Sequence, residues 1–131
     1  MRVTGDVTEP ASGGITSSEC LRVGEVLARI GDKWTVLVIN ELGEGPKRFS
    51  QLRRDIAGVS QRMLTLTLKN LERDGLVSRA VTPSVPPRVD YALTDLGGSM
   101  LAPVRALGLW AQAHIPQMDA ARGRYDAKEM A

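Results

Sequence analysis

The chain has 131 residues, which fits one domain with a modest core, and its 43% apolar and 24% charged residues are typical of a globular protein. No apolar run approaches the roughly 18 residues of a membrane-spanning helix, and the first residues lack the apolar segment of a secretory signal. One cysteine and one histidine exclude an internal disulfide and the common zinc sites. No paired catalytic residues and no phosphate-binding loop appear, so we expect neither a cofactor nor an enzyme, and the lone cysteine fits a reducing cytoplasm.

The N-terminal region divides into an arm and a helix. Residues 1–17 are rich in glycine, serine, threonine and proline and have no periodicity, so we expect a flexible arm. Ser18 is placed to cap a first helix over residues 18–30. The apolar stripe of that helix is Val23, Val26, Leu27 and Ile30.

Cys20 lies in the first turn of this predicted helix. The helix dipole and Arg22 favour a thiolate there, whereas Glu19 opposes it. One interpretation is a redox sensor, and the other is an inert, small apolar side chain. The sequence leaves both open.

A second helix is predicted over residues 33–42, with Gly31 ending the first helix and Asp32 capping the second. Apolar residues cover most of its circumference, which indicates a central core helix with Trp34 as a packing anchor. A short strand is expected over residues 47–49.

Residues 49–75 predict two helices joined by a tight turn. Apolar residues at Phe49, Leu52 and Ile56 share one face of the first helix, and Gly58 provides the positive φ of the turn. Ser60 is placed to cap the second helix. The apolar stripe of the second helix is Leu64, Leu68 and Leu71, and its outward side chains are Gln61, Arg62, Thr65 and Lys69.

Those four outward side chains are hydrogen-bonding groups and cations near a helix start. That chemistry suits the base edges and phosphates of a DNA major groove. A helical hairpin with a solvated polar face would show the same pattern.

Two strands are predicted over residues 76–82 and 88–94, where the periodicity becomes alternating. The proline-rich loop over residues 83–87 joins them, so the hairpin is the wing of a winged helix-turn-helix. Arg79 and Arg88 are interpreted as contacts to the DNA backbone, with exposed strand cations as the alternative.

The charge distribution supports this interpretation. Residues 47–90 hold nine basic and four acidic residues, a net charge of +5, and the rest of the chain holds eight and eleven, a net charge of −3. Positive charge is therefore concentrated where a polyanion would bind.

Residues 95–118 predict a terminal helix capped by Thr94 and kinked or restarted by Pro103. Its apolar residues extend past a single face, which favours a dimer interface over folding back on the core of the same chain. The residues assigned to that interface are Leu101, Leu107, Leu109 and Trp110. The domain is expected to span residues 18–121, and residues 122–131 are expected to be a frayed tail.

Several segments together resemble the HxlR family of bacterial winged helix-turn-helix regulators, within the MarR-like superfamily. The resemblance covers roughly residues 20–114 and rests on IGDKWTVLVINEL, RFSQLRRDIAGVSQRMLTLTLKNLERDGLVSR, VDYALTDLGGSML and LGLWA. It implies a mainly α fold with a small β-hairpin (α+β), dimeric through the N- and C-terminal helices over residues 18–30 and 95–118. It also implies a homodimer that binds a two-fold symmetric DNA operator and represses a nearby gene, at the nucleoid.

The resemblance also bears on the sensor. The family's frequent N-terminal cysteine falls on Cys20, and some members use such a cysteine to sense oxidants or electrophiles. The family often has Cys-Pro at this place, whereas this chain has Cys20 followed by Leu21. A small apolar inducer between the first and last helices is the competing hypothesis.

The expected functional residues follow from these patterns. Gln61, Arg62 and Thr65 are predicted to approach base edges, with Arg62 the best match for guanine. The remaining predicted DNA contacts are Ser50, Gln51, Ser60, Lys69, Arg79 and Arg88. A winged helix that binds only other proteins, without sequence-specific DNA binding, is the alternative function.

Overall fold

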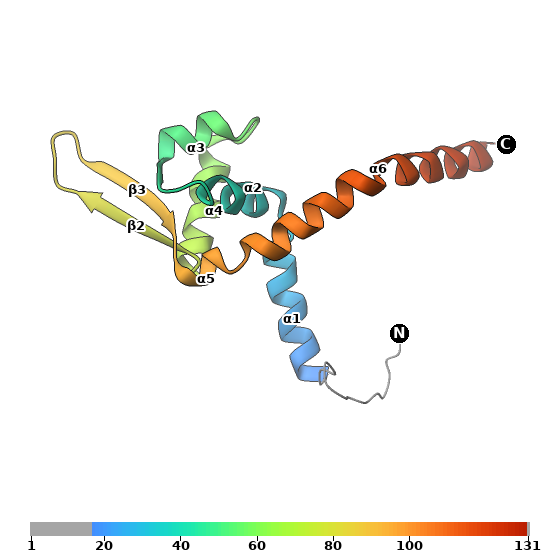
Figure 1. Cartoon of the computed structure of the whole chain (residues 1–131), viewed down its shortest axis with the longest axis horizontal. Helices are drawn as coiled ribbons and strands as arrows, with labels where there is room; N and C mark the ends of the chain where they lie inside the picture. The colour runs from blue at the N-terminus through green and yellow to red at the C-terminus, as the bar shows by residue number, and fades with distance from the viewer. Residues whose placement is uncertain (1–16, 131) are drawn as a thin grey trace.

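The computed structural model describes residues 17–130 (Figure 1). Residues 1–16, where nearly all of the predicted arm falls, lie outside the described part. The elements in chain order are α1 (Ser17–Ile30), α2 (Lys33–Leu42), β1 (Lys47–Arg48), α3 (Phe49–Asp55), α4 (Gln61–Arg73), β2 (Val77–Thr82), β3 (Arg88–Leu93), α5 (Asp95–Gly98) and α6 (Leu101–Met130). The predicted mainly α fold with a small hairpin is confirmed. Within residues 17–130, no helix combines the length and the apolar character needed to cross a membrane.

The helices begin where short polar side chains replace missing backbone partners. Asp32 accepts hydrogen bonds from the backbone N–H groups of Trp34 and Thr35 at the start of α2. Ser60 caps α4, and Thr94 accepts from the N–H of Gly97 at the start of α5. Three of the four predicted caps are therefore confirmed, whereas Ser18, the fourth, lies inside α1, which begins one residue earlier at Ser17.

The three strands form one antiparallel sheet in the order β1-β3-β2. Lys47 on β1 and Arg79 on β2 both pair with Tyr91 on the central strand. Val77, at the root of the hairpin, is buried, whereas the other residues of β2 are exposed. The hairpin is thus anchored at its root and projects from the body, as Figure 1 shows.

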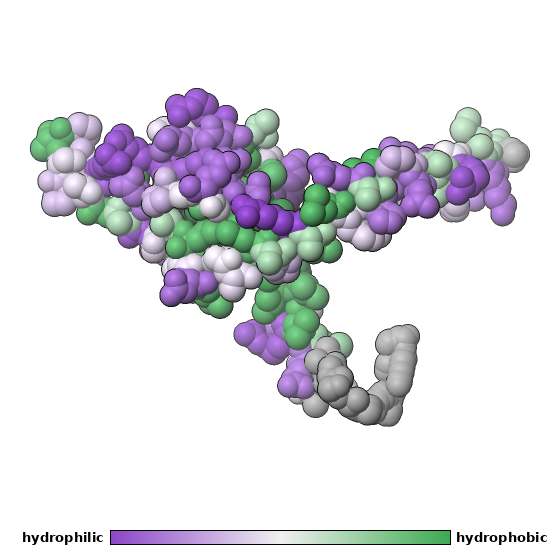
Figure 2. Space-filling model, in the orientation of Figure 1, coloured by the Kyte–Doolittle hydropathy of each residue, from purple (hydrophilic) through white to green (hydrophobic). Residues whose placement is uncertain are grey.

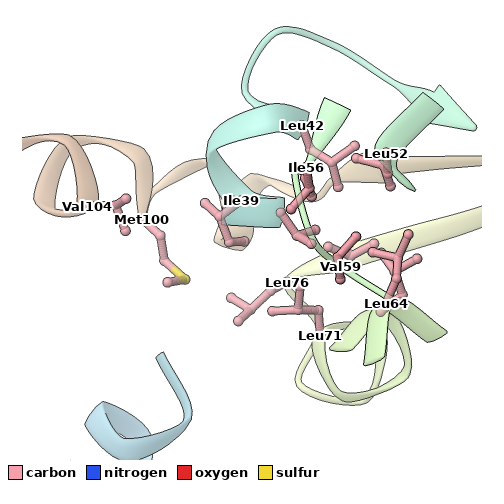
Figure 3. Packing of buried hydrophobic residues seen from close by; sticks show 13 residues of the cluster. Ile39, Leu42, Leu52, Ile56, Val59, Leu64, Leu71, Leu76, Met100 and Val104 are labelled. Carbon is pink, nitrogen blue, oxygen red and sulfur yellow. The ribbon is translucent and has the colours of Figure 1, made fainter. Parts of the chain in front are cut away.

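A single apolar core joins the helices to the root of the wing. Figure 3 shows buried side chains converging from α2, α3, α4 and the beginning of α6. The three leucines predicted as the inward stripe of α4 (Leu64, Leu68 and Leu71) are all buried. Gly58 has a φ of 83°, the left-handed value expected for the turn between α3 and α4.

One prediction about helix α2 needs correction. Leu37 is partly exposed, so the helix is not buried all round but buries one face, made by Val38, Ile39 and Leu42. Thr35 is also buried on that face, although its polarity did not suggest it.

The C-terminal region also differs from prediction. The helix predicted over residues 95–118, with a kink or restart at Pro103, is two helices, because the chain turns at residues 99–100. The second, α6, begins at Leu101, and Pro103 lies in its first turn, where its missing N–H has no partner to lose. The predicted frayed tail over residues 122–131 is helical as far as Met130. Alanine, arginine, lysine and glutamate dominate that segment, and these residues favour a helix.

Helices α1 and α6 extend from the body in different directions (Figure 1). α1 contributes no buried side chain to this chain, and α6 contributes only Val104. An ion pair links α1 to the end of α4, since Nη1 of Arg29 lies 3.1 Å from Oδ2 of Asp74.

Candidate nucleic-acid interface

Helix α4 is held so that its polar face points outward. Leu64, Leu68 and Leu71 fix one side in the core, and the hydroxyl of Ser60 accepts a hydrogen bond from the N–H of Met63 at 3.0 Å. The four side chains predicted to face DNA (Gln61, Arg62, Thr65 and Lys69) are all exposed. The structure therefore brings them together on one surface, which we call the α4 face.

The cations and the shorter side chains of the α4 face differ in their contacts. Arg62 and Lys69 make no hydrogen bond or ion pair with residues 17–130, so their charges are available to an external anion. The hydroxyl of Thr65 donates to the backbone carbonyl of Gln61 at 2.8 Å, so its hydrogen is engaged and an external partner can use only its acceptor lone pairs and its methyl group.

Helix α3 brings two further predicted residues near the sheet. Ser50 and Gln51 lie in its first turn and are exposed. Oε1 of Gln51 accepts a hydrogen bond from the N–H of Arg48 at 2.9 Å, so this oxygen serves the start of the helix. The amide NH₂ of Gln51 remains as the group that an acceptor could use.

The wing carries the two predicted arginines on different strands. Arg79 is exposed on β2, and Arg88 begins β3. Nε of Arg88 lies 3.1 Å from Oδ2 of Asp90, two residues along the same strand. This contact uses the Nε side of the guanidinium and leaves other N–H groups for an acceptor.

Lys47 does not contribute to the outward positive field, although it belongs to the basic segment. Its Nζ lies 2.7 Å from Oε1 of Glu41 and 3.1 Å from carboxylate oxygens of both Glu44 and Asp55. The hydrogen bond from Lys47 to Glu41, followed by those to Glu44 and Asp55, raises the pKa of Lys47 above its ordinary value of 10.5, against the opposing effect of burial. This cluster joins the end of α2 to β1 and α3, and so helps to fix the position of α3 relative to α2.

The other predicted functional residues lie on the projecting helices. Cys20 is exposed on α1 as a free thiol. Leu107, Leu109 and Trp110 are exposed on α6, and apolar surface over α1 and the near part of α6 is visible in Figure 2. Leu101 differs from the other three predicted interface residues, because it is half-buried and packs against the core of its own chain, beside Gly43.

One residue beside the α4 face was missed by sequence reasoning. Arg53, in the last turn of α3, donates from Nη1 to Oε1 of Gln61 at 3.4 Å. Helical spacing offered a signal, since Arg53 follows the predicted contact Ser50 by three residues and so shares its face. The pairing with Gln61 depends on the angle between two helices, which the spacing does not give.

Comparison with known proteins places these features in a family context. A family model described as HxlR-like helix-turn-helix matches residues 29–119. The chain is 45% identical over 98 residues to YtfH of Escherichia coli (strain K12), an HTH-type transcriptional regulator, covering 75% of this chain and 78% of YtfH.

Two solved structures extend the comparison. The putative transcriptional regulator ytfH from Salmonella typhimurium has a TM-score of 0.70 and 42% identity, covering 77% of this chain and 90% of that chain. The reduced form of the transcriptional regulator YodB from B. subtilis has a TM-score of 0.64 and 36% identity, covering 70% of this chain and 90% of that chain. A diamide-treated form of YodB is also among the similar structures.

Proposed function

This chain belongs to the HxlR-like helix-turn-helix family of transcriptional regulators, and from that premise we propose that it binds a two-fold symmetric DNA operator as a homodimer and represses transcription. The observation that carries the proposal is the α4 face. It presents Arg62 and Lys69 without partners among residues 17–130, on a helix whose opposite side is fixed in the core.

The proposal assigns two kinds of contact. Gln61, Arg62 and Thr65 approach base edges in the major groove, where Arg62 can donate two hydrogen bonds to guanine. The backbone of the DNA is held by Ser50, Gln51, Lys69 and Arg88, with Ser60 and Arg79 at the margins. Their exposure on α3, the α4 face and the wing supports this division.

The test begins with selection of bound sequences from random duplexes, followed by affinity measurements on the selected operator. Arg62→Ala should weaken operator binding by roughly 1–3 kcal/mol and relax preference at one position. Lys69→Ala should weaken all sequences alike and lower the salt dependence by about one phosphate contact. Arg124→Ala, an exposed cation late in α6, is the matched control and should change neither.

Two outcomes would contradict the assignment. Unchanged binding of both operator and random duplex by Arg62→Ala would show that another surface reads the bases. Absence of any salt-dependent DNA binding would favour the alternative, a winged helix that contacts only other proteins.

The proposed homodimer rests on the apolar side chains that α1 and α6 leave exposed. Monomeric proteins rarely expose many large apolar side chains on neighbouring helices. Here the exposed ones are Val26 and Leu27 on α1 and Leu107, Leu109 and Trp110 on α6. A second copy of this chain would cover them and set two α4 helices about 34 Å apart, one DNA turn. Sedimentation should show a dimer, and the selected operator should be a palindrome with half-sites at that spacing.

We propose Cys20 as the point at which an oxidant acts. The chain holds no second cysteine, so a disulfide must join two chains or attach a small thiol to one. With diamide, two Cys20 thiols would lose two protons and two electrons to form the disulfide, and diamide would be reduced to the hydrazine. The exposure of this thiol supports access.

Cys20→Ser separates this sensor from its competitor. The variant should keep operator binding after diamide or quinone treatment, whereas wild type should release DNA. Release by both would show that Cys20 is not the sensor. Thermal-shift measurements on reduced protein with aromatic metabolites would then test an apolar inducer between α1 and α6.

A further inference from the structure

We propose that Arg53 determines which base the α4 face prefers, by orienting the side-chain amide of Gln61. Arg53 acts as a positioning residue, and its effect on DNA passes through Gln61. The inference rests on the proposed function, because it concerns base reading by α4.

The backbone geometry between the two residues is well fixed. Ile56 and Val59, in the turn between α3 and α4, are both buried, and Ser60 caps α4 immediately before Gln61. The carbonyl of Gln61 is held by the hydroxyl of Thr65 at 2.8 Å. The ends of the two helices are therefore set, and Arg53 reaches Gln61 without rearrangement of the turn.

The contact decides which end of the amide points away from Arg53. A guanidinium only donates hydrogen bonds, so Nη1 of Arg53, at 3.4 Å, faces the amide oxygen of Gln61 rather than its nitrogen. The NH₂ group of Gln61 is then the end directed to a ligand. Gln61 thus approaches DNA as a hydrogen-bond donor.

The donor and acceptor groups on the base edges determine which base this orientation of Gln61 prefers. A glutamine pairs with adenine by accepting from N6 and donating to N7, which requires both ends of the amide. Because the contact turns the oxygen toward Arg53, the NH₂ group is the end of the amide that faces a base, and its donation suits the acceptors of guanine (O6 and N7) or thymine (O4). The structure therefore points to a guanine or thymine facing Gln61, with adenine disfavoured.

The experiment compares four duplexes that differ only at the base read by Gln61. That position is identified as the one at which Gln61→Ala loses preference in the selected operator. Wild type should favour guanine or thymine over adenine there, and Arg53→Ala should reduce the preference about threefold to tenfold, the effect of one hydrogen bond. In the Gln61→Ala background, Arg53→Ala should cause no further change in preference.

Arg54→Ala is the matched control, because Arg54 is an exposed cation in the same turn of α3. It should leave the ranking of the four bases unchanged. A second variant, Gln61→Glu, keeps a partner for Arg53 but removes the NH₂ donor, so the preference for guanine or thymine should disappear.

Three results would overturn the inference. The first is an equal loss of affinity for all four duplexes in Arg53→Ala, which is the signature of a phosphate contact. The second is an unchanged ranking of the four bases in Gln61→Glu. The third is a preference of the wild type for adenine at this position. Failure of wild type to select any sequence is a distinct result, because it would remove the proposed function itself.

Discussion

The segment from α2 to β3, which we call the reading part, supplies most of the apolar core, whereas α1 and α6 leave most of their apolar side chains exposed. Of the thirteen buried apolar residues within 17–130, eleven lie between Val38 and Val77, and the other two are Met100 and Val104 in the C-terminal region. Burial of apolar area is the main source of stability, so the reading part is expected to fold with little help from α1 or the far part of α6. The two projecting helices need a partner surface that the reading part does not.

The largest effect should come from equal truncations in the two regions. Leu64 is 0% exposed and Leu107 is 69% exposed. Leu64→Ala should lower the free energy of unfolding by about 2–5 kcal/mol, because it leaves a cavity. Leu107→Ala should cost little in dilute protein and more as concentration rises, because its loss falls on the dimer.

Denaturant unfolding at two protein concentrations measures the loss of unfolding free energy in both variants. An equal loss in Leu107→Ala and Leu64→Ala in dilute protein would contradict the contrast between the two regions, since it would place Leu107 in the core of a single chain.

The next largest effect should come from placing alanine at two glycines, Gly97 in α5 and Gly108 in α6. A Cβ on Gly97 would overlap the backbone carbonyl of Leu76 at the root of the wing, whereas a Cβ on Gly108 in α6 would meet no atom of residues 17–130 within 4 Å beyond its chain neighbours and the nearby backbone of the helix itself. Gly97→Ala should destabilise by about 1–3 kcal/mol through overpacking. Gly108→Ala should stabilise α6 by up to about 1 kcal/mol through helix propensity.

Thermal unfolding of both variants supplies the measurement. A destabilising Gly108→Ala would sharpen the comparison, because it would show that a partner chain packs closely at that point of α6.

Removal of the Lys47 charge should have a smaller effect, confined to the reading part. Its side chain is 12% exposed among three carboxylates. Lys47→Met should cost about 1–3 kcal/mol, since it leaves hydrogen-bonded carboxylates without their cation.

The sign of the pH dependence follows from the raised pKa of Lys47. The stabilisation is complete below the ordinary value of 10.5 and is lost only as the pH rises through the higher folded pKa. The difference between Lys47→Met and wild type should therefore be the same at about pH 6 and about pH 9. A difference that shrinks within that range would contradict the protonated cluster.

The smallest effect concerns the ion pair that links the two regions. Arg29 and Asp74 are both more than a third exposed, so a double-mutant cycle with Arg29→Ala and Asp74→Ala should give a coupling of about 0.2–1 kcal/mol. Repeating the cycle in high salt should reduce it. Zero coupling in low salt would show that the regions are joined by α2 and the core alone.

Local features of the fold were predictable, because they depend on neighbours in sequence. The caps at Asp32, Ser60 and Thr94 and the turn at Gly58 follow from residue type and spacing. The winged helix-turn-helix arrangement followed from the order of the elements and is confirmed by similar solved structures.

Contacts between elements were not predictable in the same way. Lys47 was assigned to a positive surface, but the chain brings Glu41, Glu44 and Asp55 around it from α2, α3 and the loop between α2 and β1. Leu101 was assigned to a dimer interface, and its packing against the core of its own chain was not foreseen. The pairing of Arg53 with Gln61 likewise depends on the angle between α3 and α4, and the apolar spacing within each helix does not determine that angle.

The ion pair between Arg29 and Asp74 has a mechanical consequence. Arg29 lies one residue before the end of α1, and Asp74 is the C-cap of α4. A rotation of α1 about the short connection at residues 31–32 must either stretch this pair or pull on the last turn of the helix that carries the α4 face. The pair thus couples the orientation of α1 to the end of α4. Because both side chains are exposed, a large movement of α1 would break the pair, whereas a small one would be passed on to α4.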